Sequence, residues 1–168
     1  MAAPARGIVA IELAAVIAVT LVMVALAISA YRTYSARSEV SRTLAAIEPV
    51  QTLVAHAYEV TGVPPASHRD VPGWPEAMVP PPLLQAIAVK HGHLEVRFGA
   101  DAAAGLRGKT LHITPLETTD GHVVWHCGEG PPGVGLNPLG FVDGTNRAAE
   151  LSTTVERRFL PDECRYSR

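Results

Sequence analysis

The chain has 168 residues and a mass of 17.8 kDa, which fits one domain and is too short for two with a linker. Apolar residues make up 48%, charged residues 18%, and the net charge is −2. These values exclude a multidomain enzyme and a basic nucleic-acid module, and two cysteines exclude a disulfide-dense scaffold.

The first predicted element is an apolar helix over residues 8–30, a segment in which Glu12 is the only charged residue. As a helix it would be about 35 Å long, enough to cross a hydrocarbon core of about 30 Å. No A-x-A-like cleavage site follows it, and Tyr31, Arg32 and Tyr34 suit a membrane–water boundary. The segment therefore predicts a membrane-spanning helix, with a buried core helix as the alternative.

Glu12 is unusual inside this run, because an ionised carboxylate is costly in a membrane interior and is normally paired. One interpretation is a polar residue tolerated close to one membrane surface. The other, which we favour, is that Glu12 neutralises a cation inside an assembly.

The helix is predicted to continue as an amphipathic half over residues 31–62. Its apolar stripe follows a spacing of three and four residues through Val40, Leu44, Ile47, Gln51, Val54 and Tyr58. Pro49 lies inside this pattern and predicts a kink near residues 45–48. Gly62, followed by two prolines, is expected to end the helix.

The remaining residues, 63–168, predict a head built on an antiparallel sheet. Residues 63–91 are rich in proline and predict a surface connection, in which residues 83–87 form a helical turn or a lid. Alternating patterns predict three strands, at residues 93–98, 109–114 and 122–127.

The turn before the third strand is expected at Thr119-Asp120-Gly121. Residues 128–144 are rich in glycine and proline and predict irregular structure, and residues 148–158 a short helix or a further strand. Together these patterns predict an α+β fold, with a long N-terminal helix on a sheet of about four strands.

Seven histidines raise the question of a metal site. His91 and His93 could share a strand face, as could His122 and His126. No Asp, Glu or Cys cluster completes either pair in the sequence, so we expect surface histidines and no metal site. The chain also contains no G-x-S-x-G motif, P-loop or conspicuous carboxylate pair, which predicts a non-enzymatic protein without a cofactor.

Cys127 and Cys164 are the two cysteines, and their separation is unlike that of a redox or zinc motif. If the head is exported, oxidation to one disulfide is expected; two buried free thiols are the alternative. Such a bond would stabilise a glycine- and proline-rich segment by about 4 kcal/mol on the chain-entropy model.

Several motifs resemble those of type IV pilins, the Gram-negative major pilins made as prepilins with a class III signal peptide. Arg6-Gly7, followed by an apolar run with Glu12, is similar to the family's leader-processing site. The resemblance extends to these segments: Ala57-Tyr58-Glu59 with Gly62, residues 108–115, residues 121–127, and Phe159-Leu160-Pro161 before Cys164.

This resemblance implies a leader at residues 1–7, a transmembrane and filament-core helix at 8–30, the amphipathic half at 31–62, and a pilin head with a C-terminal disulfide loop at 63–168. A prepilin peptidase would cut after Gly7 and methylate Ile8, and Glu12 would act in subunit assembly. The implied protein is a pilus subunit that polymerises with itself and uses the pilus assembly machinery. It would sit in the inner membrane before assembly and in an extracellular filament afterwards.

For the filament, the resemblance implies roles in adhesion, twitching motility and DNA uptake, through contacts with host surfaces or DNA. The alternatives are a minor pilin, a type II secretion pseudopilin, or a single-pass membrane-anchored periplasmic binding domain that never polymerises. The cysteine pair argues against the major pseudopilin, which as a family uses a calcium site instead.

The sequence departs from the family pattern at three positions. Ile8 stands where the family usually has phenylalanine, and Leu21 and Ser29 stand where many pilins have glycine and proline. Because leucine favours helix over glycine by about 0.8 kcal/mol, we expect residues 8–46 to be continuously helical in the isolated subunit.

Overall fold

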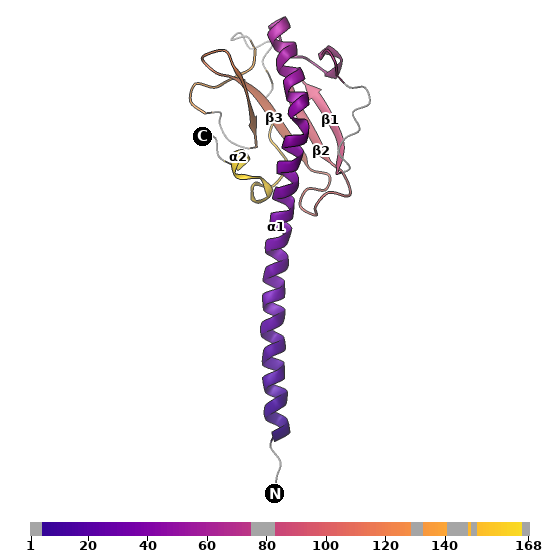
Figure 1. Ribbon diagram of the computed structural model, residues 1–168, viewed down its shortest axis with the longest axis vertical. Helices are drawn as coiled ribbons and strands as arrows, with labels where there is room; N and C mark the ends of the chain where they lie inside the picture. The colour runs from indigo at the N-terminus through magenta and orange to yellow at the C-terminus, as the bar shows by residue number, and fades with distance from the viewer. Residues whose placement is uncertain (1–4, 75–82, 129–132, 141–147, 149–150, 166–168) are drawn as a thin grey trace.

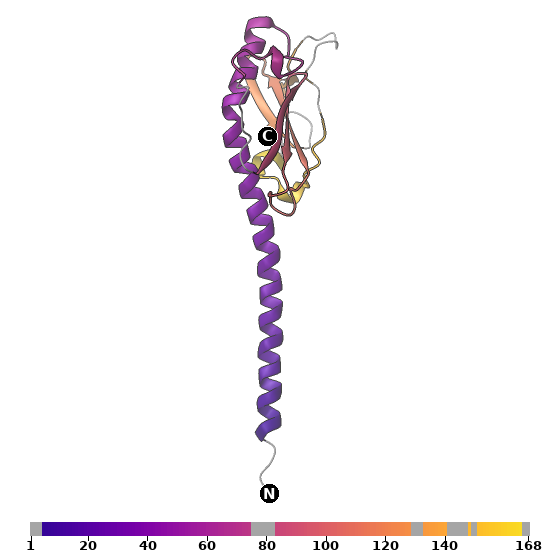
Figure 2. The same ribbon diagram turned by 90° about the vertical axis from the view of Figure 1, so that its right-hand side faces the viewer.

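One helix extends from the N-terminal end of the molecule to the far end of a head that packs against its second half (Figures 1 and 2). The structure is a computed structural model. It describes residues 5–74, 83–128, 133–140, 148 and 151–165, and the backbone alone for residues 5–9.

The helix, α1, runs from Ala5 to Thr61 without interruption, a length of about 85 Å. It ends where Gly62 adopts a φ of 67° and donates its N–H to the carbonyl of Tyr58 at 2.7 Å, as expected from the sequence. Pro49 lies on an exposed part of α1, where water can hydrate the carbonyl that proline leaves without a donor. The helix curves gently in Figure 2, and the kink angle at Pro49 stays a prediction. Continuous helix over residues 8–46 is confirmed.

The second half of α1 buries a narrow stripe against the sheet. Apart from Glu39, its buried residues recur at alternating steps of four and three: Ala36, Val40, Thr43, Ile47, Val50, Val54 and Ala57. The predicted stripe is therefore partly wrong, because Leu44, Gln51 and Tyr58 lie at its half-buried edge and not at its centre. A repeat of about 3.5 residues keeps one seam of the helix facing the sheet.

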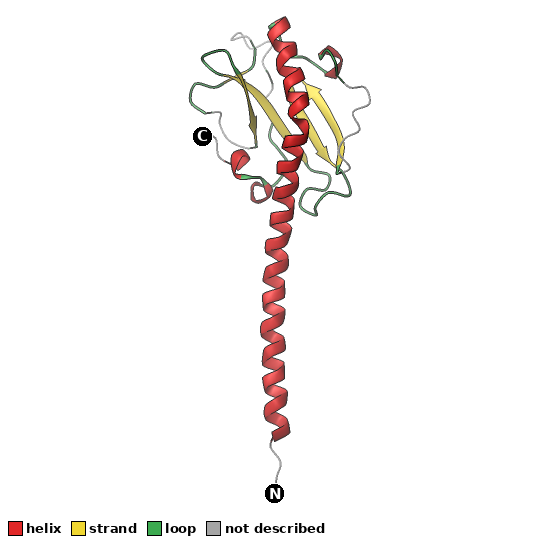
Figure 3. Ribbon diagram, viewed as in Figure 1, coloured by secondary structure: helices red, strands yellow, loops and turns green. Residues whose placement is uncertain are grey.

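The sheet is antiparallel and packs one face on α1, as Figure 3 shows. Its strands are β1 (Leu84–Lys90), β2 (His93–Phe98), β3 (Thr110–Glu117) and β4 (Val123–Cys127), in that spatial order, with the short β5 (Asn137–Pro138) also paired to β3. Alternate residues of the inner strands, including Leu94, Val96, Leu111 and Ile113, join the helix stripe in the core. The side chains between them point to the opposite face.

The prediction of a helical turn or lid at residues 83–87 is wrong, because this segment opens strand β1. A register shift between Leu84 and Ala86 breaks the alternation, which removes the period-two signal from the sequence. The strand joins β2 through a two-residue turn in which His91 and Gly92 both have positive φ, as tight hairpins require. The turn expected at residues 119–121 is confirmed by the N–H of Gly121 bonding to the carbonyl of Thr118.

The C-terminal segments lie against the sheet with little regular structure. Residues 128–144 contain β5, and residues 129–132 and 141–144 of this range lie outside the described residues. The described residues of the range 148–158 contain no strand. The last two residues of this range begin the 3₁₀ turn η2 (Arg157–Phe159). Thr154 is tied to β3 by its backbone N–H, which donates to the carbonyl of Thr110 at 2.9 Å.

A disulfide closes the head between Cys127, at the end of β4, and Cys164, in the single-turn helix α2 (Asp162–Arg165). The expected bond is therefore present. Gly128 follows with a φ of 98°, and a Cβ there would lie 2.0 Å from the carbonyl oxygen of Cys164. Only glycine permits this close approach of the two chain segments.

Removing the cross-link should destabilise the head while leaving the first half of α1 intact. The double variant Cys127→Ala/Cys164→Ala should lower the free energy of unfolding by about 4 kcal/mol, because the bond closes a loop of 37 residues. Denaturant unfolding followed by tryptophan fluorescence, in detergent, measures this. The matched control is reductant, which should weaken the wild type and leave the double variant unchanged. A difference below about 1 kcal/mol would contradict the account.

Candidate assembly surface

The first half of α1 exposes apolar side chains on all of its sides. Large residues with about half or more of their surface exposed follow one another through Ile11, Leu13, Val16, Ile17, Val19, Leu21, Val22, Met23, Val24, Leu26 and Ile28. They do not form one stripe, and Figure 1 shows this half of the helix standing clear of the head. This is the one helix of the described chain that is long and apolar enough to cross a membrane. An apolar surface of this size needs lipid or other chains around it.

Two threonine hydroxyl groups of this part of α1 have hydrogen-bond partners within the helix. The hydroxyl of Thr20 donates to the carbonyl of Val16 at 2.8 Å, so it is satisfied within the helix. Thr33 does the same with the carbonyl of Ser29 at 3.3 Å. A helix of this kind can lose its water without leaving these two hydroxyl groups unpaired.

Glu12 lies on the exposed surface of α1, and no hydrogen bond or ion pair to its carboxylate occurs within the part of the chain that the structure describes. Gly7 and Ile8 are already in the helix, so the backbone is helical across the expected cleavage point. The structure thus places the three predicted residues near the N-terminal end of the apolar surface. Their expected roles remain predictions.

Polar contacts between residues far apart in the sequence join the second half of α1 to the head. Arg37 Nε donates to the carbonyl of Arg158 at 2.9 Å, and Tyr58 donates its hydroxyl to Glu117 Oε2 at 3.3 Å. Burial, together with the negative charge of Glu117, raises the pKa of Tyr58. These contacts, one near each end of the packed region, fix how far α1 projects beyond the head.

Glu39 makes a further contact, and nothing in the sequence distinguishes it from an ordinary acid on a helix surface. It is only 9% exposed, and its Oε2 accepts the backbone N–H of Ala103 at 3.0 Å. Ala103 belongs to the connection between β2 and β3, whose Ala102 and Leu106 are fully buried. Glu39 therefore holds this connection against the helix.

The structure brings together histidines that the sequence analysis did not pair. His91 lies in the β1–β2 turn and His122 is exposed, so neither expected pair forms a cluster within the described residues. Instead His93, Glu95 and His112 gather on adjacent strands, with one ligand-type atom from each within 4.8 Å of the others. The sequence analysis expected histidines on the surface, but His93 is buried.

Comparison with known proteins finds similarity to filament subunits over most of the chain. The family described as pilin (bacterial filament) matches residues 36–165, well over half of the chain. A fimbrial protein of Neisseria meningitidis serogroup B is 26% identical over 161 residues, covering 95% of this chain and 94% of the relative. A type IV major pilin protein, PilE, of Neisseria gonorrhoeae is 24% identical, covering 95% and 93%.

Replacing Glu39 tests whether it joins helix and head. Glu39→Ala should lower the free energy of unfolding of the head by about 1–3 kcal/mol, because the N–H of Ala103 loses its acceptor in a partly buried place. Ser41→Ala, at an exposed position on the same helix, is the matched control and should change stability by less than about 0.5 kcal/mol. Denaturant titration of both variants measures the difference; equal stabilities would contradict the role of Glu39.

Proposed function

The chain belongs to the pilin family of bacterial filament proteins, and from this membership we propose that it is the main repeating subunit of a type IV pilus. Its role is structural. The observation that carries the proposal is the first half of α1, which is apolar and exposed on every side. The end-to-end similarity to type IV major pilins supports a filament subunit.

The apolar half of α1 would serve in two environments. Residues 8–30 span about 35 Å as a helix, which suits a bilayer core of about 30 Å before assembly. In the filament the same surface would bury against equivalent helices, because helices that are apolar all round require apolar neighbours. The head lies at one end of this apolar segment (Figure 2). It would therefore remain outside the membrane before assembly and on the outside of the filament afterwards.

Maturation would create the charge that Glu12 needs. Cleavage after Gly7 by a prepilin peptidase would leave Ile8 with a cationic amine, methylated by the same enzyme. Ile8 and Glu12 are four residues apart in α1, hence on one face and about 6 Å apart along the axis. A neighbouring subunit shifted by about one helical turn would bring its amine level with this carboxylate.

Pairing of these charges would select the register of the subunits. In a dry bundle of apolar helices, a charge without a partner costs several kcal/mol. Axial offsets between subunits that separate the amine from Glu12 would therefore be unfavourable. The paired state need not be much more stable than an apolar contact in its place. The charges would specify alignment, and the apolar side chains would supply the burial.

The maturation step predicts the N-terminus of the protein recovered from membranes or sheared filaments. The mature chain should begin at Ile8 and carry one N-methyl group, which intact-mass analysis detects. Gly7→Leu should retain residues 1–7, because the peptidase of this family cuts after glycine. A wild-type chain that starts at Met1, or is cut beyond Ala30, would contradict the proposal and favour a non-polymerising membrane anchor.

Glu12→Ala should impair filament assembly without harming the subunit. Removing the charge makes the segment more apolar, so membrane insertion should persist. The neighbour's amine would lose its partner, at a cost of about 3–5 kcal/mol if the site is fully buried. Filament yield with the variant as the sole subunit, and its co-assembly with wild type, are the measurements.

The matched control for this variant is Glu163→Ala, which removes an equal charge from the exposed surface of the head. It should assemble normally, because exposed substitutions change stability by less than about 0.5 kcal/mol. Normal filament numbers with Glu12→Ala alone would contradict the assembly role of Glu12.

A further inference from the structure

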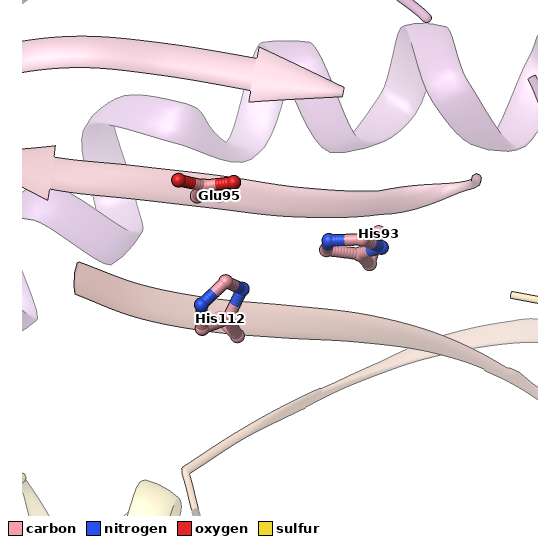
Figure 4. Close-up of side chains that lie close together, drawn as sticks. All are labelled: His93, Glu95 and His112. Atoms are coloured by element: carbon pink, nitrogen blue, oxygen red, sulfur yellow. The ribbon is translucent and has the colours of Figure 1, made fainter. Parts of the chain in front are cut away.

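Three side chains with metal-binding atoms meet on the face of the sheet opposite α1. His93 and Glu95 are two residues apart on β2, and Glu95 is the register partner of His112 on β3. Alternation therefore puts all three on one face, while Leu94 and Ile113 point into the core. Figure 4 shows the three side chains lying close together on the two strands, with a ring nitrogen of His93 on the side of His112.

His93 is buried without a partner for either ring nitrogen. It is 1% exposed, and neither Nδ1 nor Nε2 has a hydrogen bond within the described parts of the chain. His112 Nδ1 is also buried without a hydrogen-bond partner. The centroids of the two imidazole rings lie 5.7 Å apart, and the ring planes are inclined at 49°. Buried polar atoms normally have partners, so these nitrogens require an explanation.

Burial disfavours the charged form of both imidazoles. Burial, and next the neighbouring His112, lower the pKa of His93 to about 4, and burial also lowers the pKa of His112. A neutral imidazole carries a lone pair on one ring nitrogen, which is the atom that coordinates a metal. The hydrogen bond and charge of Lys90 lower the pKa of Glu95, which keeps its carboxylate ionised.

We propose that His93, Glu95 and His112 form a binding site for a borderline divalent transition metal, with Zn²⁺ as the best match. Two imidazoles and one carboxylate are the protein ligands of many three-ligand zinc sites, which leave the fourth position open. Nitrogen donors disfavour Ca²⁺ and Mg²⁺, which prefer all-oxygen sites. The metal would give one nitrogen of each buried ring the partner that it lacks.

Only a small closure of the cluster is needed. The donor atoms lie within 4.8 Å of one another, whereas two ligands on a tetrahedral zinc ion are about 3.4 Å apart. Glu95 and His112 are only partly buried, and the Glu95 side chain is 21% exposed, so they can adjust and admit the ion. His93, at the buried end, would be the fixed ligand.

Lys90 competes with the metal in this arrangement. Its ammonium forms an ion pair with Glu95 and lies beside the cluster. Binding of a dication requires Lys90 to turn away, which its 55% exposed side chain allows. Lys90 thus weakens the site and makes its affinity depend on the charge at residue 90.

The test uses the full chain, without a histidine tag, in detergent and metal-free buffer. Calorimetric titration with ZnCl₂ alone should show saturable binding of one ion per chain, and CaCl₂ should show none. Glu95→Gln and His112→Gln, checked for folding by circular dichroism, should each weaken Zn²⁺ binding at least tenfold. His122→Gln, an exposed histidine outside the cluster, is the matched control and should bind like wild type.

Lys90→Met is a variant that should strengthen Zn²⁺ binding and that leaves the three proposed ligands unchanged. It should bind Zn²⁺ several-fold more tightly, because the competing ammonium is gone; unchanged or weaker binding would contradict the competition. Absence of saturable Zn²⁺ binding in the wild type, or equal affinities for wild type, Glu95→Gln and His112→Gln, would overturn the site. The site lies in the head, so these results are independent of whether the chain forms a pilus.

Discussion

The constraint behind this structure is an apolar helix surface that the chain itself does not cover. The head packs on α1 from Ala36 to Ala57 and leaves the residues before it exposed. Burial of that surface must come from outside the chain, and under the proposed function lipid and then equivalent helices would supply it. A narrow buried stripe and polar contacts hold the head at one end of this segment, and the disulfide closes the head itself.

Much of the fold could be predicted from local patterns. The long helix follows from an apolar run joined to an amphipathic repeat, and its end follows from Gly62. Strands β2, β3 and β4 were predictable because apolar and polar side chains alternate over much of their length, although polar residues on the face away from α1, such as His93, are also buried. The disulfide was predictable because the chain has two cysteines, which can pair only with each other within one chain.

The remainder depends on contacts between residues far apart in the sequence. Strand β1 carries a register irregularity that hides its period, and β5 is only two residues long. In the sequence Glu39 looks like an exposed acid on a helix. The β2–β3 connection that contacts it lies far away along the chain. Glu95 joins the histidines only through the register of β2 and β3, in which it faces His112. No spacing within one strand reveals such a cluster.

The most direct test of the account is a filament map that resolves backbone and side chains around residues 8–30. The account predicts these segments as packed helices at the filament axis, with the heads outside and each Glu12 carboxylate within ion-pair distance of the Ile8 amine of another subunit. Apolar segments that lie outside the filament core, or Glu12 carboxylates placed in the core without a cationic neighbour, would contradict it.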